Sequence, residues 1–147
     1  GGTATGSTTV TVTTDNRAGY TLSIEATSDP AMQSGPYTID DYAPAGDPDF
    51  EFDTAPTESH FGYSPEGPHI EARFQDDGNA CNAGPGDTPD RCWDGLTTDP
   101  VVIATDTNSN HPNGTDTTIK FQVGVGGSVN QEPGTYVATT TLTLLPL

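Results

Sequence analysis

Oxygen-bearing side chains recur at alternate positions in the segment DTNSNHPNGTD, residues 106–116. Carboxylate and amide oxygens spaced in this way in a loop suit Ca²⁺, which takes about six to eight oxygen ligands. We therefore expect a calcium site in this segment, and the alternative is an ordinary solvated loop, because Asp, Asn and Gly are common in loops. The predicted ligands are Asp106, Asn108, Asn110 and Asp116.

The two cysteines, Cys81 and Cys92, flank a polar segment rich in Gly, Pro and Asp. Two cysteines so placed most simply form a local disulfide, which implies an oxidising compartment. The alternative is a pair of free thiols. Zinc is disfavoured, because the spacing is not that of a zinc-binding pair and no His lies nearby.

Asn113 begins the sequence Asn-Gly-Thr, which is an acceptor site for N-glycosylation where the host modifies asparagine. Such a site is expected on the surface of a secreted protein, although the triplet also arises by chance. We treat Asn113 as a candidate glycosylation site.

Catalytic motifs are not found in the chain. The three histidines show no H-E-x-x-H spacing, and neither a G-x-S-x-G turn nor a phosphate-binding glycine loop occurs. The 21 acidic residues make a carboxylate pair uninformative. We expect a protein that is not an enzyme, and the net charge of −17 argues against nucleic acid and anionic membranes as partners.

The sequence contains no apolar run that approaches the ~18 residues needed for a membrane-spanning helix. The start at Gly1-Gly2-Thr3 is typical of a processed, mature protein. Together with the predicted disulfide, these features favour a secreted, extracellular or cell-surface location.

The elements that must position these residues are predicted to be strands. Leu, Ile, Val and Phe make up about 16% of the chain, which at this net charge is usual for disorder, but they cluster in alternating runs. Strands are expected at 20–26, 99–105, 117–125 and 135–145, with shorter candidates at 37–39, 49–53 and 69–74. We predict one all-β domain, a jelly roll or β-sandwich with long loops.

The two ends of the chain resemble a family of secreted bacterial surface proteins. The segments that carry the resemblance are TVTVTTDNRAGYTLSIEA near the start and TTIKFQVGVGGSVNQEPGTYVATTTLTLL at the end. They are most similar to the jelly-roll fibre subunits of biofilm matrices, of the TasA and camelysin type, and to pilin-like surface proteins. About fifty residues are covered, and the middle of the chain has no such likeness.

The resemblance implies assembly by donor strand, in which the N-terminal segment of one subunit completes the sheet of the next. Residues 1–14 would then be the donor segment, with Thr8, Val10 and Val12 in the strand, and 15–147 the sandwich. The alternative is that this segment pairs with a strand of its own chain. Main-chain hydrogen bonds would supply affinity, and alternate side chains would fill pockets. The expected function is that of a structural subunit of an extracellular homopolymer, a pilus or biofilm-matrix fibre.

A carbohydrate-binding or adhesin module of a surface protein is the alternative function, with surface glycans as partners. Aromatic side chains of the middle segment could form a platform on which sugar rings stack. The candidates are Trp93, Tyr37, Tyr42 and Tyr63. Against this, Trp93 is adjacent to Cys92 and is also expected to pack over the disulfide.

Overall fold

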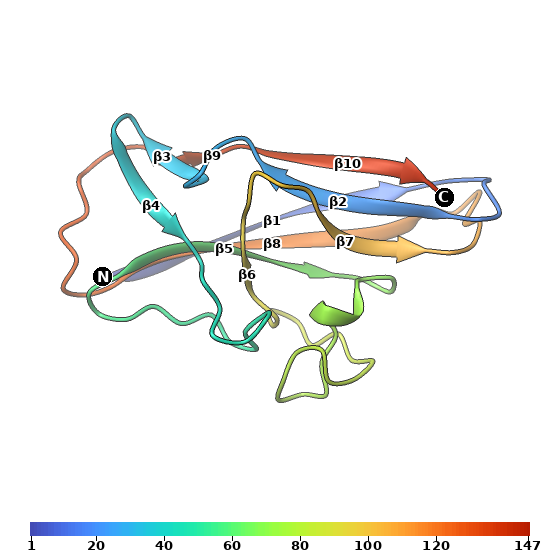
Figure 1. Cartoon of the computed structure of the whole chain (residues 1–147), viewed down its shortest axis with the longest axis horizontal. Coiled ribbons are helices and arrows are strands. Elements are labelled where there is room, and N and C mark those ends of the chain that lie inside the picture. Colours follow the sequence, from blue (N-terminus) through green and yellow to red (C-terminus); the bar gives the residue numbers. More distant parts are fainter.

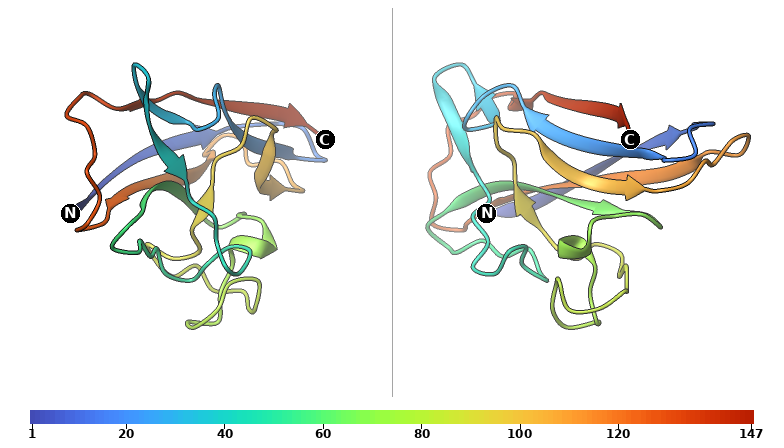
Figure 2. Two further views of the ribbon diagram at one scale, coloured as in Figure 1. Left: turned by 60° about the vertical axis from the view of Figure 1, so that its left-hand side comes forward. Right: turned by 45° about the vertical axis from the view of Figure 1, so that its right-hand side comes forward.

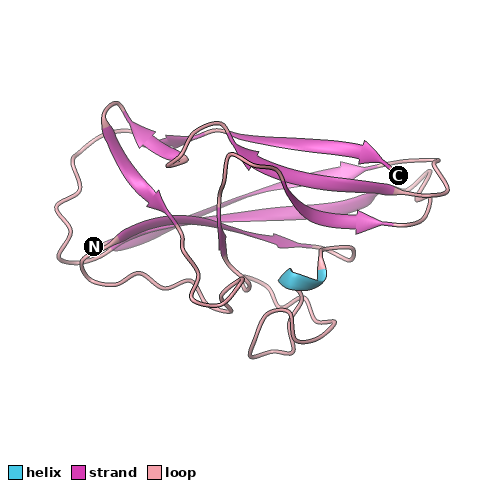
Figure 3. Ribbon diagram, in the orientation of Figure 1, coloured by secondary structure: helices cyan, strands magenta, loops and turns pink.

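Strands dominate the computed structural model, which describes residues 1–147 and confirms the prediction of an all-β sandwich. A single 3₁₀ turn, η1, is the one helical element (Figure 3). No helix in the structure has the length and apolar character needed to cross a membrane. The elements are β1 (Gly2–Val12), β2 (Tyr20–Ala26), β3 (Met32–Ser34), β4 (Tyr37–Asp41), β5 (Ser59–Glu66), η1 (Ala72–Phe74), β6 (Asp94–Gly95), β7 (Val101–Asp106), β8 (Thr115–Val125), β9 (Val137–Ala138) and β10 (Thr140–Pro146).

Two sheets form the layers of the sandwich (Figure 1). The larger sheet has the order β1-β8-β5-β4-β3-β9, with β6 also paired to β5, and the smaller has the order β10-β2-β7. β9 pairs with β3, and the next strand, β10, pairs with β2, so the C-terminal segment passes from one sheet to the other. Figure 1 shows β9 almost in line with β10, since the larger sheet curls over at that end.

The core lies between the two sheets and follows the predicted alternation. Tyr20, Leu22 and Ile24 of β2 are almost fully buried, while the intervening residues are half-buried. They pack in one cluster with Ile103 of β7 and Ile119 of β8. Because inward-facing positions recur with period two, the short apolar runs suffice to build one core despite the low apolar content.

Outside the core, an aromatic cluster covers the outer face of the larger sheet. Tyr42 stacks on Phe52 with ring centroids 4.5 Å apart, and Phe52 meets Trp93 edge to face at 5.4 Å. The rings fit because the sheet carries glycines beneath them, and a Cβ on Gly124 would lie 3.1 Å from the Phe52 ring. The acidic middle segment is therefore packed against the sheet by its aromatic residues.

Three local predictions are wrong in detail. Residues 49–53 form a loop, because the Asp49 carboxylate accepts bonds from the N–H groups of Ala45 and Gly46. Residues 69–74 end in η1, and β5 was not predicted. The strand expected at 135–145 is interrupted at Thr139, where the chain changes sheets.

Candidate functional site at the N-terminal edge strand

β1 is the edge strand of the larger sheet and pairs with β8 of the same chain along its whole length, from Gly2 opposite Val125 to Val12 opposite Thr115. Every residue from Gly2 to Thr9 is exposed, Val10 is half-buried, and Val12 is 3% exposed. Of the predicted donor residues, Thr8 lies on the surface, whereas both valines contact the core. The first eight residues of the strand are therefore attached almost entirely by the main-chain ladder.

Hydroxyl groups add a few side-chain contacts to this ladder. The Thr9 and Thr118 hydroxyls lie 2.8 Å apart, and the Thr11 hydroxyl donates to Oδ1 of Asp116 at 2.5 Å. Asp116, predicted to bind calcium, is thus engaged by β1 across the strand pair. These contacts lie near the C-terminal part of β1, and the side chains of Gly2–Thr8 make no hydrogen bonds within the chain.

Asn110 anchors the C-terminal end of β1, which we call the root of the strand (Val12–Thr14). Its Oδ1 accepts a hydrogen bond from the Thr14 N–H at 2.7 Å, and its Nδ2 donates to the Val12 carbonyl at 2.8 Å and to the Thr115 hydroxyl at 2.9 Å. The Asn110 main-chain N–H also donates to the Thr14 carbonyl at 3.1 Å. A single amide side chain therefore joins the root to the turn before β8.

Lys120 of β8 lies beside β1 and pairs with two acidic side chains. Lys120, opposite Ser7 in the ladder, lies with its Nζ 3.2 Å from Oδ1 of Asp90 and 3.8 Å from Oε2 of Glu66. The hydrogen bond that Lys120 donates to Asp90 and the negative charge of Glu66 raise the pKa of Lys120. β1 itself has no charged side chain, so its pairing with β8 adds no like-charge repulsion.

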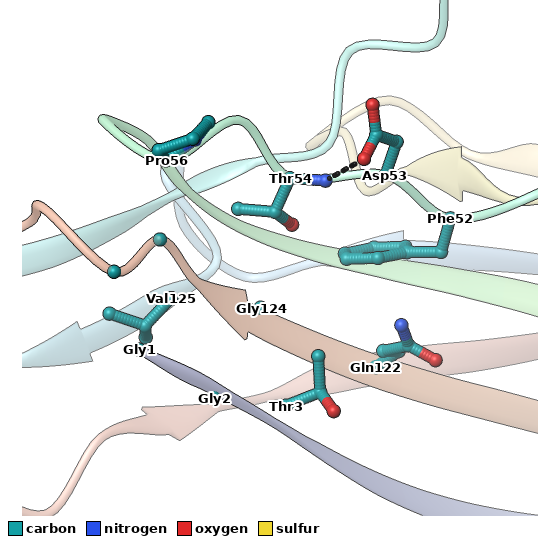
Figure 4. Close-up of a pocket in the computed structure, with 12 residues that line it drawn as sticks. Gly1, Gly2, Thr3, Phe52, Asp53, Thr54, Pro56, Gln122, Gly124 and Val125 are labelled. Atoms are coloured by element: carbon teal, nitrogen blue, oxygen red, sulfur yellow. Dashed lines mark hydrogen bonds between the residues drawn. The ribbon is translucent and has the colours of Figure 1, made fainter.

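The largest hollow in the molecule lies at the N-terminal end of β1 and has a volume of about 600 Å³ (Figure 4). Gly1–Thr3 form one wall, and Gln122 and Gly124–Gly127 form another, with the loop residues Phe52–Thr54 and Pro56 above them. Asp53 is the one carboxylate in the lining, and its Oδ1 accepts the Thr54 N–H at 2.9 Å. The hollow exists because β1 is in place.

A shallow apolar groove, the seam groove, lies between β1 and the C-terminal segment. It consists of two hollows of about 180 and 260 Å³ that share Met32, Phe61 and Phe121. Ala4–Gly6 line one part, and Ala138 and Thr140 line the other. The sandwich is therefore incompletely closed on the side where β1 and β10 are both edge strands.

The predicted calcium ligands serve other contacts in this structure. Asp106 is 3% exposed, with Oδ1 accepting the Asn108 N–H at 3.0 Å and Oδ2 lying 3.3 Å from Nε2 of His69. Asn110 and Asp116 hold β1, as described above, and Asn108 is exposed. Calcium binding at these residues stays a prediction, and an ion there would have to displace these hydrogen bonds.

The predicted disulfide between Cys81 and Cys92 is confirmed. Next to it, the buried Asp76 carboxylate accepts bonds from the Thr88 N–H at 2.8 Å, the Thr88 hydroxyl at 2.7 Å and the Gly78 N–H at 2.7 Å. Although its burial acts in the opposite direction, these bonds hold the pKa of Asp76 below its ordinary value. The disulfide and Asp76 together organise the acidic loop internally.

The predicted sugar-stacking platform is absent. Trp93 is 2%, Tyr42 7% and Tyr63 0% exposed, and only Tyr37 presents its ring to solvent. The Trp93 indole N–H donates to the Asp90 carbonyl at 3.1 Å, so the ring belongs to the aromatic cluster under the loops. Asn113 is exposed in a turn, and its glycosylation stays a prediction.

A cluster of ionic groups around the buried Asp94 carboxylate lies away from the edge strand. Nη2 of Arg73 lies 2.6 Å from Oδ2 of Asp94 and also pairs with Asp47. Burial raises the pKa of Asp94, and burial likewise raises the pKa of the neighbouring Tyr63. No group of three or more His, Cys, Asp or Glu side chains in the structure could hold a metal ion.

The fold is an all-β sandwich whose N-terminal edge strand is held over Gly2–Thr9 almost entirely by main-chain pairing with β8. Comparison with family models, curated proteins and solved structures finds no match to this chain.

Proposed function

We propose that this chain is the structural subunit of an extracellular filament, and that it assembles by exchanging β1 between neighbouring copies. The observation that carries the proposal is the way in which β1 is held. From Gly2 to Thr9 it is exposed, yet it forms a complete ladder with β8. The β8 edge of any identical chain can supply the same main-chain bonds, which is the mode of recognition known from strand addition.

The position of the root supports a head-to-tail arrangement. Figures 1 and 2 show the N-terminus and the C-terminus at opposite ends of the molecule, and β1 joins the sandwich at the end where the C-terminus lies. A β1 strand released from its own β8 would project beyond that end. Exchange with the next copy in line is a heterologous contact, and such contacts produce open filaments when the rotation between copies does not close a ring.

Charge favours β1 as the contact in a chain of net charge −17. Residues 1–14 have no charged side chain, and the β8 residue Lys120 is already paired with acidic groups. Donation of this strand therefore brings no acidic side chain of one copy onto the ladder of another. The disulfide fits an oxidising, extracellular location.

A covalent lock between β1 and β8 of one chain tests the proposal. The Thr9 and Thr118 side-chain oxygens are 2.8 Å apart, so Thr9→Cys/Thr118→Cys should form a disulfide within the chain. We expect the oxidised variant to form no filaments in negative-stain micrographs and to form filaments after reduction. Wild-type protein with the same reductant controls for loss of the Cys81–Cys92 bond. Filaments from the oxidised, fully locked variant would refute strand exchange.

A further inference from the structure

The second free edge of the sandwich is that of β10. In the smaller sheet β10 pairs only with β2. The opposite edge strand, β7, is covered, because Glu71 donates its N–H to the Ile103 carbonyl and Thr105 donates to the His69 carbonyl, both at 2.9 Å. One edge of this sheet is thus closed by the chain itself, and the other is open.

The ladder register fixes which main-chain groups of β10 are free. The Leu147 N–H donates to the Gly19 carbonyl, and the Thr27 N–H donates to the Thr139 carbonyl. Since hydrogen-bonded pairs alternate along antiparallel strands, the odd-numbered residues of β10 bond to β2. Thr140, Leu142 and Leu144 therefore direct their N–H and C=O groups outward, away from the sheet. Pro146 has the same parity, and its missing N–H lies on this free edge.

Apolar side chains without nearby charge accompany this open edge. Leu144 is 47%, Leu145 57% and Leu147 52% exposed. Residues 135–147 contain no charged side chain. Natural edge strands are usually guarded by charged side chains, prolines or bulges against pairing with other chains, and β10 has such a guard only at Pro146. The open edge of β10 therefore combines free main-chain groups with exposed leucines and has no charged side chain.

We infer that β10 is a homotypic contact, at which two copies of this chain pair their β10 strands antiparallel. A pairing centred on Leu142 places Thr140 of one copy opposite Leu144 of the other, so the outward-facing residues of both copies meet as hydrogen-bonded pairs. The strand is thus complementary to itself. The two smaller sheets then become one continuous sheet with the order β7-β2-β10-β10-β2-β7.

Charge selects a second copy as the occupant. In a chain with 21 acidic residues, both free edges, β1 and β10, lack charged side chains and lie on the same side of the sandwich (Figure 1). Like chains can approach there with the least repulsion between acidic groups. A cationic partner would find no acidic side chain on β10 to recognise.

This contact is independent of strand exchange, since it uses neither β1 nor β8. If the proposed filament forms, β10 remains unpaired along its length, and the same contact would join filaments side by side. That last consequence rests on the proposed function, whereas the pairing of two subunits does not.

The oxidised Thr9→Cys/Thr118→Cys protein is the sample for the test, because its β1 cannot exchange. Sedimentation equilibrium should give an average mass that rises from monomer toward dimer with concentration. Added NaCl should strengthen the association, because it screens the repulsion between two chains of charge −17. A monomer at every concentration and salt would overturn the inference and would leave the proposed strand exchange untouched.

Substitutions on this background locate the contact. Leu144→Lys should weaken the dimer at least tenfold, although it lowers the net negative charge by one. The matched control, Thr57→Lys, makes the same charge change in an exposed loop and should leave the dimer as strong or stronger. Thr140→Pro, which removes one outward-facing N–H and keeps the bonds to β2, should weaken the dimer as well. Equal association of all three variants, each shown to be folded by circular dichroism, would contradict pairing through β10.

Discussion

At the scale of single residues, Asn110 connects the candidate site to the body of the protein. Its side chain bonds to Val12 and Thr14 at the root of β1, and to Thr115 at the start of β8. The spacing of oxygen-bearing residues suggested a cation ligand here. In the structure the Asn110 amide acts as both donor and acceptor, a role that residue spacing alone does not reveal.

Asn110→Asp should therefore lower the free energy of unfolding by about 1–3 kcal/mol, because the Val12 carbonyl loses its donor and faces a carboxylate instead. Urea unfolding measures the loss, and hydrogen exchange should show faster exchange at the root. Asn108→Asp adds the same charge at an exposed neighbour and should change stability little. Equal losses in the two variants would show that charge, and not the hydrogen bonds, matters at this site.

Asp41, at the end of β4, gives the stability a dependence on pH. Its Oδ2 accepts the Ala31 N–H at 3.0 Å, but its buried Oδ1 has no hydrogen-bond partner. Burial, with a smaller contribution from Asp29 and Asp40, raises the pKa of Asp41 from 3.8 to about 6. The folded state thus binds this proton more tightly than the unfolded state, so its contribution to stability is complete below about pH 4 and is lost as the pH rises through 6.

Asp41→Asn should remove this dependence while keeping an acceptor for Ala31. The melting temperature of the variant relative to wild type should increase between about pH 4 and pH 6 and stay higher above that range. The difference between the two proteins cancels the titration of the other acidic groups. A difference in melting temperature between the two proteins that does not change with pH across this range would contradict a buried, protonated Asp41.

At the scale of elements, β1 has two parts with different attachments. Gly2–Thr9 bury no side chain, whereas Val12 is in the core and Thr14 is bonded to Asn110. Deletion of residues 1–9 should therefore leave a folded protein, as judged by circular dichroism, that forms no filaments in negative-stain micrographs. Deletion of 1–14 should also lose the Val12 packing and the root, with a clear fall in melting temperature. If the shorter deletion still polymerises, β1 is not the exchanged element.

The strands with clean alternation were predictable from the sequence, and β2 and β8 are the best examples. The start of β1 was not, because Gly2–Thr9 owe their extended form to the neighbouring β8 edge and to no property of their own side chains. β5 was missed for a similar reason: its Gly62 and Pro65 are poor strand formers, and burial between β8 and β6 sets its conformation. The disulfide was predictable from the sequence, and so was a strand that contains Val10 and Val12. The Asn110 contacts were not, because they join residues almost one hundred positions apart.

At the scale of the whole molecule, the acidic side chains lie outside the two strands, β1 and β10, that leave a sheet edge open. The acidic residues lie between the terminal segments 1–14 and 135–147, which supply the two unpaired edges and have no charged side chain. Both contacts proposed above, the exchange of β1 and the pairing of β10, therefore use strands without charged side chains in a chain of net charge −17.

Strand exchange between copies is the central claim, and a disulfide formed only between chains tests it most directly. Two variants, Thr9→Cys and Thr118→Cys, are mixed under filament-forming conditions and then oxidised. Because neither chain holds both new cysteines, the exchange of β1 predicts covalently linked dimers, one chain of each variant, on a non-reducing gel. These dimers should be absent when either variant is oxidised alone. Filaments that yield only single chains after oxidation of the mixture would contradict the account.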